Sequence, residues 1–231
     1  MMGFGTAIVI GQSGGIGEAL YRQLEGSGLW QRVVGLSRAT TPVLDLKDER
    51  AIEACAAYCQ KISGDIQLVI DATGVLSWEG HQPEKSWRQL DPKEMQNAFL
   101  VNAIGPGLLM KHFLPLLPKD RKSVFATLSA RVGSIEDNHT GGWYSYRASK
   151  AALNQLVRTA SIELRRKNRQ AICVALHPGT VDTPLSGQFA KTGLEVQSPG
   201  RSAARLLGVI ERLRAEDNGC FFDHMGKRIP W

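Results

Sequence analysis

A glycine-rich turn directly after the first apolar segment is the feature that most restricts the fold. Gly11, Gly15 and Gly17 follow the pattern Gly-x3-Gly-x-Gly, between the apolar run Thr6–Ile10 and a helix-forming stretch. Glycines let the backbone approach a phosphate without a Cβ clash, and a helix start offers free N–H groups and a positive dipole end. The spacing predicts a strand–turn–helix unit that binds a dinucleotide pyrophosphate. A glycine turn with no ligand is the alternative.

Short apolar runs alternate with longer amphipathic stretches along the whole chain. Expected strands are Thr6–Ile10, Arg32–Leu36, Leu68–Asp71, Ser123–Leu128, Ala171–Leu176 and Cys220–Phe222, with a further short candidate at Pro42–Leu44. Expected helices are Gly15–Glu25, Glu49–Ile62, Lys93–Leu116, Tyr146–Lys167 and Pro199–Leu213. Val-, Ile- and Leu-rich strands that alternate with helices are typical of parallel sheets buried on both faces. We expect one Rossmann-like α/β domain over residues 1–231, with about seven strands in a doubly wound sheet.

Composition is that of an ordinary globular protein. Hydrophobic residues make up 43% and charged residues 22% of the 231 residues, and no unbroken apolar run reaches the ~18–20 residues of a membrane span. The run Met1–Ile10 lacks the basic start and the cleavage site of a secretory signal. The net charge is +6, and the one dense basic cluster, Arg165, Arg166, Lys167 and Arg169, closes a long expected helix, where cations favour the negative dipole end. We expect a cytoplasmic protein with no nucleic-acid or membrane partner.

Cysteines and histidines offer no metal site. Cys55 and Cys59 stand one helical turn apart, which is not the Cys-x-x-Cys spacing, and Cys173 and Cys220 fall inside apolar runs. All four are expected as small buried hydrophobic residues. The five histidines show no ligand spacing, so no metal is predicted.

The end of the second expected strand indicates which dinucleotide binds. NAD sites usually place an acidic residue there, about 20 residues past the glycine turn, where it bonds the ribose 2′-hydroxyl. This strand ends Gly35-Leu36-Ser37-Arg38, without an acid. The planar fork of Arg38 matches a 2′-phosphate. We therefore expect NADP(H) rather than NAD(H); the alternative is that Arg38 is an exposed loop residue.

Tyr146 and Lys150 stand four residues apart at the start of a strongly helical segment. Residues i and i+4 share a helix face, so the phenol and the ammonium can point into one cleft. A nearby ammonium favours the phenolate form and lowers a tyrosine pKa from its ordinary value of about 10. Such a phenol suits general acid–base work on an alkoxide. Tyr144 is an alternative candidate for this role. Its Tyr-x5-Lys spacing places its side chain well round the helix from Lys150, so Tyr144 is expected on the substrate side.

The order of these motifs resembles the short-chain dehydrogenase/reductase family over nearly the whole chain. After the glycine turn come Asn102 in a mid-chain helix, a serine after the next strand, Tyr146-x3-Lys150, and Pro178-Gly179. The stretches 128–135 and 141–154 look like the C-factor and sniffer-type carbonyl reductase branch.

The resemblance implies a role for each matching position. Tyr146 would be the general acid/base, Lys150 would bind the nicotinamide ribose and lower the tyrosine pKa, and Asn102 would hold a water that links Lys150 to solvent. A serine would hydrogen-bond the substrate oxygen. The residues expected at the cofactor are Gly11, Ser13, Gly15, Ile16 and Gly17 at the pyrophosphate, Ser37 and Arg38 at the ribose, Asp45 and Leu46 at the adenine, Ala72, Thr73, Gly74, Asn102, Tyr146 and Lys150 further in, and Pro178, Gly179, Val181 and Thr183 at the carboxamide.

Three positions depart from the family's usual residues. Ile10 stands in place of a threonine, and Asp71-Ala72-Thr73-Gly74 in place of Asn-Asn-Ala-Gly. Asp71 is expected either as an exposed hydrogen-bonding strand end or as a local anomaly. Ala130 occupies the position where the catalytic serine often stands. Ser129 or Ser134 must then supply the hydroxyl, or the site works without one; Ser129, which directly ends its strand, is favoured over Ser134.

The motif combination predicts an NADP(H)-dependent ketone or aldehyde reductase that acts on a small-molecule carbonyl or alcohol. The alternative is a cofactor-binding regulatory or signalling protein of the C-factor type with little turnover. Segments 76–87, 139–144 and 185–196 are expected to line the substrate pocket, the last within a lid over 182–198. Trp78, Trp143 and Phe189 offer it apolar surface.

Two further expectations concern the surface. Family members commonly pair through the helices that contain Asn102 and Tyr146, so a homodimer or homotetramer is expected. Arg131 and Arg147 are expected to be solvated surface charges.

Overall fold

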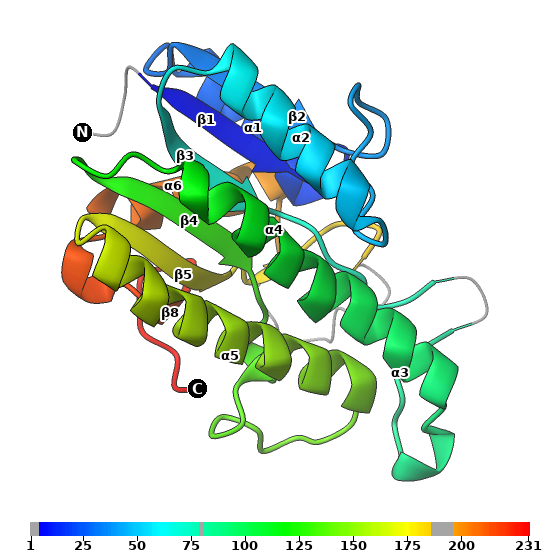
Figure 1. Cartoon of the computed structure of the whole chain (residues 1–231). Helices are drawn as coiled ribbons and strands as arrows, with labels where there is room; N and C mark the ends of the chain where they lie inside the picture. The colour runs from blue at the N-terminus through cyan, green and yellow to red at the C-terminus, as the bar shows by residue number, and fades with distance from the viewer. Residues whose placement is uncertain (1–4, 79–80, 186–195) are drawn as a thin grey trace.

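A six-stranded sheet with the strand order β2-β1-β3-β4-β5-β8 forms the centre of the protein (Figure 1). The computed structural model describes residues 5–78, 81–185 and 196–231. The strands are β1 (Thr6–Ile10), β2 (Arg32–Leu36), β3 (Ile66–Asp71), β4 (Ser123–Leu128), β5 (Ala171–His177) and β8 (Phe221–Asp223). Every neighbouring pair is parallel, so all carboxyl ends lie at one edge. The predicted Rossmann-like α/β fold is confirmed.

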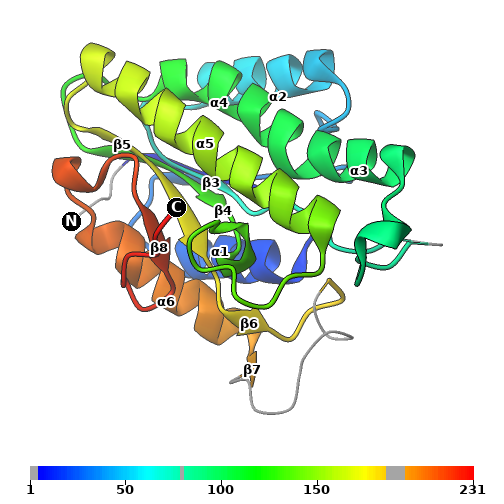
Figure 2. The same ribbon diagram turned by 90° about the horizontal axis from the view of Figure 1, so that it is seen from below.

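Helices cover both faces of this sheet (Figure 2). One face carries α2 (Glu49–Ile62), α4 (Gly105–Phe113) and α5 (Tyr144–Lys167), and the other carries α1 (Gly15–Gly26) and α6 (Pro199–Arg212). Successive strand residues point to opposite faces. Ile8 and Ile10 therefore enter the core under α2, α4 and α5, whereas Ala7 and Val9 enter the core under α1 and α6. Burial on both sides explains why β1 is apolar at nearly every position.

A π turn, η2 (Leu100–Ile104), joins α3 (Pro92–Phe99) to α4 without a break. Such wide turns are often found at functional sites. The expected single helix is therefore present but not uniform. The stretch Pro92–Leu116 is also long and apolar enough to resemble a membrane span by length and composition; in this fold α4 packs between α2 and α5. The short turns are η1 (Trp87–Gln89), η3 (Leu114–Leu116), η4 (Arg131–Gly133) and η6 (Ala215–Asp217).

The prediction of a short strand at Pro42–Leu44 is wrong, and the sheet therefore has one strand fewer than expected. The Leu44 N–H donates to the Ser37 carbonyl and closes a loop, and a proline has no N–H to offer a ladder. A separate parallel pair, β6 (Thr180–Val181) with β7 (Val196–Gln197), lies beyond the end of β5.

The four cysteines are free thiols, three of them buried and Cys220 half-buried. Within the described ranges, no group of three His, Cys, Asp or Glu side chains is arranged to hold a metal ion.

Candidate active site

The carboxyl ends of β1 and β3 form a cradle for a phosphate group. The chain moves from β1 to β2 on one side and then crosses to β3 on the other, and a crevice opens where the strand order reverses in this way. Gly11 has φ 83°, and a Cβ there would lie 3.1 Å from the Ala72 backbone. A Cβ on Gly17 would collide with the Gly11 carbonyl. The backbone shape of this turn therefore requires glycine at both positions.

The start of α1 faces this cradle with its N–H groups uncapped. The N-cap residue, Gly14, has no side chain, and no side-chain hydrogen bond caps the helix. Ser13 is exposed and Ile16 half-buried. An uncapped helix start attracts an anion through its N–H groups and its dipole. The cradle and the helix end together fit a dinucleotide pyrophosphate.

The end of β2 lies beside the cradle and presents Arg38 to solvent. Ser37 is buried and is held by Thr40, whose Oγ1 accepts the Ser37 N–H at 2.9 Å. The Arg38 side chain is exposed, with no ion-pair partner in the described part of the chain. Asp45 accepts the Lys47 N–H, and Leu46 packs against Gly105. The sequence placed Arg38 and Asp45 near the adenosine end of a dinucleotide, and the fold leaves both accessible.

Tyr146 and Lys150 lie on one face of α5, as the i, i+4 spacing predicts. The Lys150 Nζ is 6.0 Å from the centroid of the Tyr146 ring and donates to the Leu128 carbonyl at the end of β4, at 2.8 Å. A Cβ on Gly74, after β3, would lie 3.3 Å from the same Nζ. The lysine therefore joins α5 to the carboxyl ends of β3 and β4.

Burial governs the ionisation of this pair. Lys150 is 3% exposed, and removal from water lowers its pKa to about 8, a shift that the Asp71 carboxylate opposes. Burial raises the pKa of Tyr146. The expected lowering of the tyrosine pKa is therefore not found in the protein by itself. The phenol keeps its proton at neutral pH, which is the form that donates to an alkoxide.

Asn102 is fully buried in the π turn and fixes the position of the segment after β3. Its Oδ1 accepts the Val75 N–H at 2.8 Å, and its Nδ2 donates to the Val75 carbonyl at 2.8 Å and to the Ser149 hydroxyl at 3.2 Å. Three of the four hydrogen bonds that the amide can make are thus formed with protein groups. The water-holding role that the resemblance implies for Asn102 stays a prediction.

The chain is similar to known proteins over most of its length. The model of the short chain dehydrogenase family matches residues 5–194. The chain belongs to the short-chain dehydrogenase family. The family resemblance found in the sequence is confirmed.

Among relatives of this short-chain dehydrogenase, the C-signal protein of Myxococcus xanthus is 38% identical over 62% of this chain and 81% of that protein. The 1-hydroxy-2-glutathionyl-2-methyl-3-butene dehydrogenase of a Rhodococcus species is 29% identical over 98% of this chain and 99% of that one. The NADPH-bound carbonyl reductase from chicken fatty liver covers 100% of both chains with 26% identity and a TM-score of 0.86. The Sniffer carbonyl reductase of D. melanogaster, 21% identical over 99% of this chain and 100% of that one, has a TM-score of 0.85 and supports the fold.

Two serines of the dehydrogenase were candidates for the substrate hydroxyl, and both are buried. Ser129 Oγ donates to Asn154 Oδ1 at 2.7 Å. Ser134 Oγ donates to the Trp231 carbonyl at 3.3 Å and accepts the Asp137 N–H at 3.1 Å. Ser129 thus lies at the end of β4 with its hydroxyl hydrogen given to Asn154, whereas Ser134 bonds the C-terminal residue. The preference for Ser129 stays a prediction.

The segment after β5 lies against both the cradle and α6. The Pro178 carbonyl accepts hydrogen bonds from Gln197 Nε2 at 2.7 Å and from Ser202 Oγ at 2.9 Å. Gly179 has φ 82°, Val181 is buried, and a Cβ on Gly15 would lie 2.9 Å from the Thr183 methyl. The segment thus reaches the glycine turn, where the resemblance places the carboxamide of the cofactor.

Glu84 is a buried residue of the site that the sequence did not reveal. It is 2% exposed, and its carboxylate accepts the Ser145 N–H at 3.2 Å and also the Ser145 hydroxyl. Its backbone carbonyl accepts the Trp143 N–H at 2.5 Å. The N-cap residue of α5, Trp143, has left-handed φ 53° and gives no side-chain cap. Glu84 therefore caps the catalytic helix from a separate loop, next to Tyr146.

Arg147 was expected as a solvated charge, and that expectation is wrong. Its guanidinium donates to the carbonyls of Gly141, Gly142 and Val132 and to Thr140 Oγ1. A fork with five donors can hold several carbonyls at once, so Arg147 fixes the loop that precedes α5.

Of the three aromatic rings expected at the substrate pocket, Trp143 stands beside the tyrosine. Trp143 meets Tyr146 edge-on, with 6.2 Å between the ring centroids. Trp78 stacks on His81 at 4.1 Å. Phe189 and most of the expected lid, 186–195, lie outside the described residues.

The cap predicts a measurable stability effect. Glu84→Ala leaves the Ser145 N–H and hydroxyl buried without an acceptor, so we expect the free energy of unfolding to fall by about 1–3 kcal/mol. Glu84→Gln keeps one acceptor oxygen and should lose less. Urea denaturation measures both, with the exposed Glu136→Ala as the control that changes little. A Glu84→Ala protein as stable as wild type would contradict the capping role.

Proposed function

We propose that this short-chain dehydrogenase reduces a ketone or aldehyde with NADP(H). The observation that carries the proposal is the meeting of Tyr146, Lys150 and Gly74 at the sheet edge that also holds the glycine cradle. A protonated phenol beside a buried ammonium, next to a dinucleotide cradle, is suited to hydride transfer coupled to proton transfer.

Each group of the chain then has a defined task. Gly11, Gly17 and the start of α1 hold the pyrophosphate, and the segment from Pro178 orients the nicotinamide end. When bound, NADPH supplies the hydride. Tyr146 donates its proton to the carbonyl oxygen as that oxygen gains negative charge, and Lys150 stabilises the phenolate that results. Ser129 supplies a hydroxyl for the substrate oxygen by turning its O–H from Asn154 Oδ1 to the substrate.

Two observations favour NADP(H) over NAD(H). Arg38 ends β2 exposed, where an acid would bond a ribose 2′-hydroxyl. The chicken fatty liver carbonyl reductase, similar over the whole chain, holds NADPH.

A signalling role with little turnover is the second candidate. It is favoured by the 38% identity to the C-signal protein and by Ala130, which lacks the hydroxyl often found at that position. Wild-type protein that binds NADPH but reduces no member of a broad carbonyl panel would support this candidate.

One prediction concerns Tyr146 as the general acid. Tyr146→Phe removes the proton donor but keeps the ring, so kcat/KM for NADPH-dependent reduction should fall by roughly 10²–10⁴-fold. NADPH binding, followed by fluorescence titration, should persist. Tyr144→Phe should retain turnover within about tenfold, because Tyr144 is not the acid. The opposite ranking of the two variants would move the acid to Tyr144.

The second prediction concerns the 2′-phosphate. Arg38→Ala removes a charge-assisted contact, so the Kd of NADPH should rise by about 10–100-fold while that of NADH stays nearly constant. Arg32→Ala, exposed at the other end of β2, is the control. Equal losses for NADPH and NADH, or none for either, would refute the role of Arg38.

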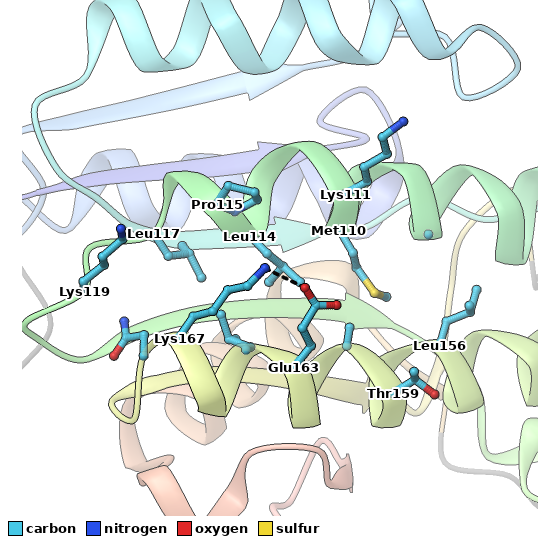
Figure 3. A pocket seen from close by; sticks show the side chains of 14 residues that line it. Met110, Lys111, Leu114, Pro115, Leu117, Lys119, Leu156, Thr159, Glu163 and Lys167 are labelled. Carbon is cyan, nitrogen blue, oxygen red and sulfur yellow. Dashed lines mark hydrogen bonds and ion pairs between the residues drawn. The ribbon is translucent and has the colours of Figure 1, made fainter.

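We also propose that two copies pair through the outer surface of α4 and α5. An apolar groove runs between these helices, and Met110, Leu114 and Leu156 line it (Figure 3). Glu163 and Lys167, an ion pair on its rim, carry charges of both signs. A two-fold interface brings the same patch of both copies together, so a patch with both signs can complement itself.

Cytoplasmic location and the absence of nucleic-acid and membrane partners stay predictions.

The pairing predicts a mass in solution. Light scattering should give twice 25.3 kDa for the wild type. Leu156→Glu places a charge in the groove and should give the single-chain mass. Leu29→Glu, exposed after α1, should keep the double mass. A wild-type protein with the single-chain mass would refute the pairing.

A further inference from the structure

Asp71 is a fully buried acid beneath the catalytic lysine. It ends β3 with 0% of its surface exposed, so of the two alternatives expected for Asp71 the exposed strand end is wrong and the local anomaly holds. The family's usual residue at this position is an uncharged asparagine. A buried carboxylate is costly unless donors and an opposite charge compensate it, and the structure supplies both.

The donors come from β4 and from the turn after β3. Thr127, the register partner of Asp71 on β4, donates its hydroxyl at 2.6 Å. Thr73 donates its N–H at 3.0 Å and its hydroxyl at 2.5 Å. Burial raises the pKa of the Asp71 carboxyl above its ordinary value, and the three donors from Thr127 and Thr73 oppose that rise because they favour the ionised form.

The opposite charge comes from α5. Lys150 Nζ is bonded to the carbonyl of Leu128, the residue after Thr127, and lies against Gly74, three residues after Asp71. The Lys150 ammonium lowers the pKa of the Asp71 carboxyl, as a smaller effect than burial and the threonine hydrogen bonds. Asp71 in turn is the charged group that acts on Lys150, and the ring of Tyr146 is the other ionisable neighbour.

We propose that Asp71 is a positioning residue that keeps Lys150 protonated, as the buried counter-charge of its ammonium. It touches neither substrate nor cofactor and acts through the lysine. The charge pair is a property of the chain itself; its effect on turnover rests on the proposed function.

The direction of the effect follows from the charges. Burial lowers the pKa of Lys150 to about 8, and the Asp71 carboxylate raises it against that effect. Asp71→Asn removes the raising contribution and keeps the shape of the side chain. Lys150 should then lose its proton at lower pH, and the ammonium that stabilises a Tyr146 phenolate disappears earlier as the pH rises.

The direct test is a pH titration of Lys150 by NMR on protein with ¹³C-labelled lysine side chains and no cofactor, with the signal assigned through Lys150→Met. We expect the pKa in Asp71→Asn to lie about one unit or more below wild type. Thr127→Val deletes a hydrogen bond but keeps the carboxylate, so its downward shift should be smaller. An unchanged pKa in Asp71→Asn, or a shift in Thr127→Val of the same size, would overturn the proposal.

A second readout distinguishes this proposal from the proposed function. The alkaline limb of the pH profile of kcat/KM for reduction should move to lower pH in Asp71→Asn. If the lysine pKa shifts and no carbonyl is reduced by any form of the protein, the charge pair stands and the proposed function fails. If Asp71→Asn does not fold, ¹³C-aspartate titration of Lys150→Met replaces it: the Asp71 pKa should rise without the ammonium, and an unchanged value overturns the pair.

Discussion

Two hydrogen bonds between the Asn102 side chain and the Val75 backbone hold the candidate active site together. They fix the segment after β3 against the long helix that crosses the sheet, and a third bond reaches Ser149 on α5. Gly74, beside Val75, can then lie against the Lys150 ammonium. Three elements far apart in the sequence are thereby positioned at one edge of the sheet. The π turn accommodates the buried polar side chain that does this.

Charge inside the protein is the second constraint. The site contains an ammonium and a carboxylate that are both buried, beside a partly buried phenol, and a buried charge is destabilising by itself. Asp71 and Lys150 compensate one another through the ends of β3 and β4, whereas Tyr146 stays neutral because burial raises its pKa. The same low polarity strengthens every interaction with a charge that develops on a substrate oxygen.

The sequence predicted the repeating architecture well and the irregular parts poorly. Strands such as Ser123–Leu128 and helices such as Glu49–Ile62 could be predicted because burial on one or two faces leaves a regular apolar pattern. Pro42–Leu44 has the same apolar character, yet it forms a loop, since its backbone bonds locally to Ser37. A short apolar run does not reveal which partners its backbone N–H and C=O groups will hydrogen-bond.

The residues that support the site were hidden for a related reason. Glu84 and Arg147 are charged residues of a type that usually lies on a solvated surface. Their roles depend on loops that fold over the start of α5. Asp71 was noticed because it departs from the family pattern, but its burial depends on pairing with β4. Tyr146, Lys150 and the glycine turn could be recognised because their spacing within one element is enough to bring them together.

The central claim is that this edge of the sheet transfers hydride between a nicotinamide and a carbonyl carbon beside Tyr146. The most direct measurement follows deuterium from NADPH labelled at the transferring position of its nicotinamide into the alcohol products of a broad ketone and aldehyde panel, by NMR. The account predicts deuterium on the carbinol carbon with wild-type protein and almost none with Tyr146→Phe. A protein that binds NADPH firmly and yields no deuterated alcohol from any member of the panel would contradict it.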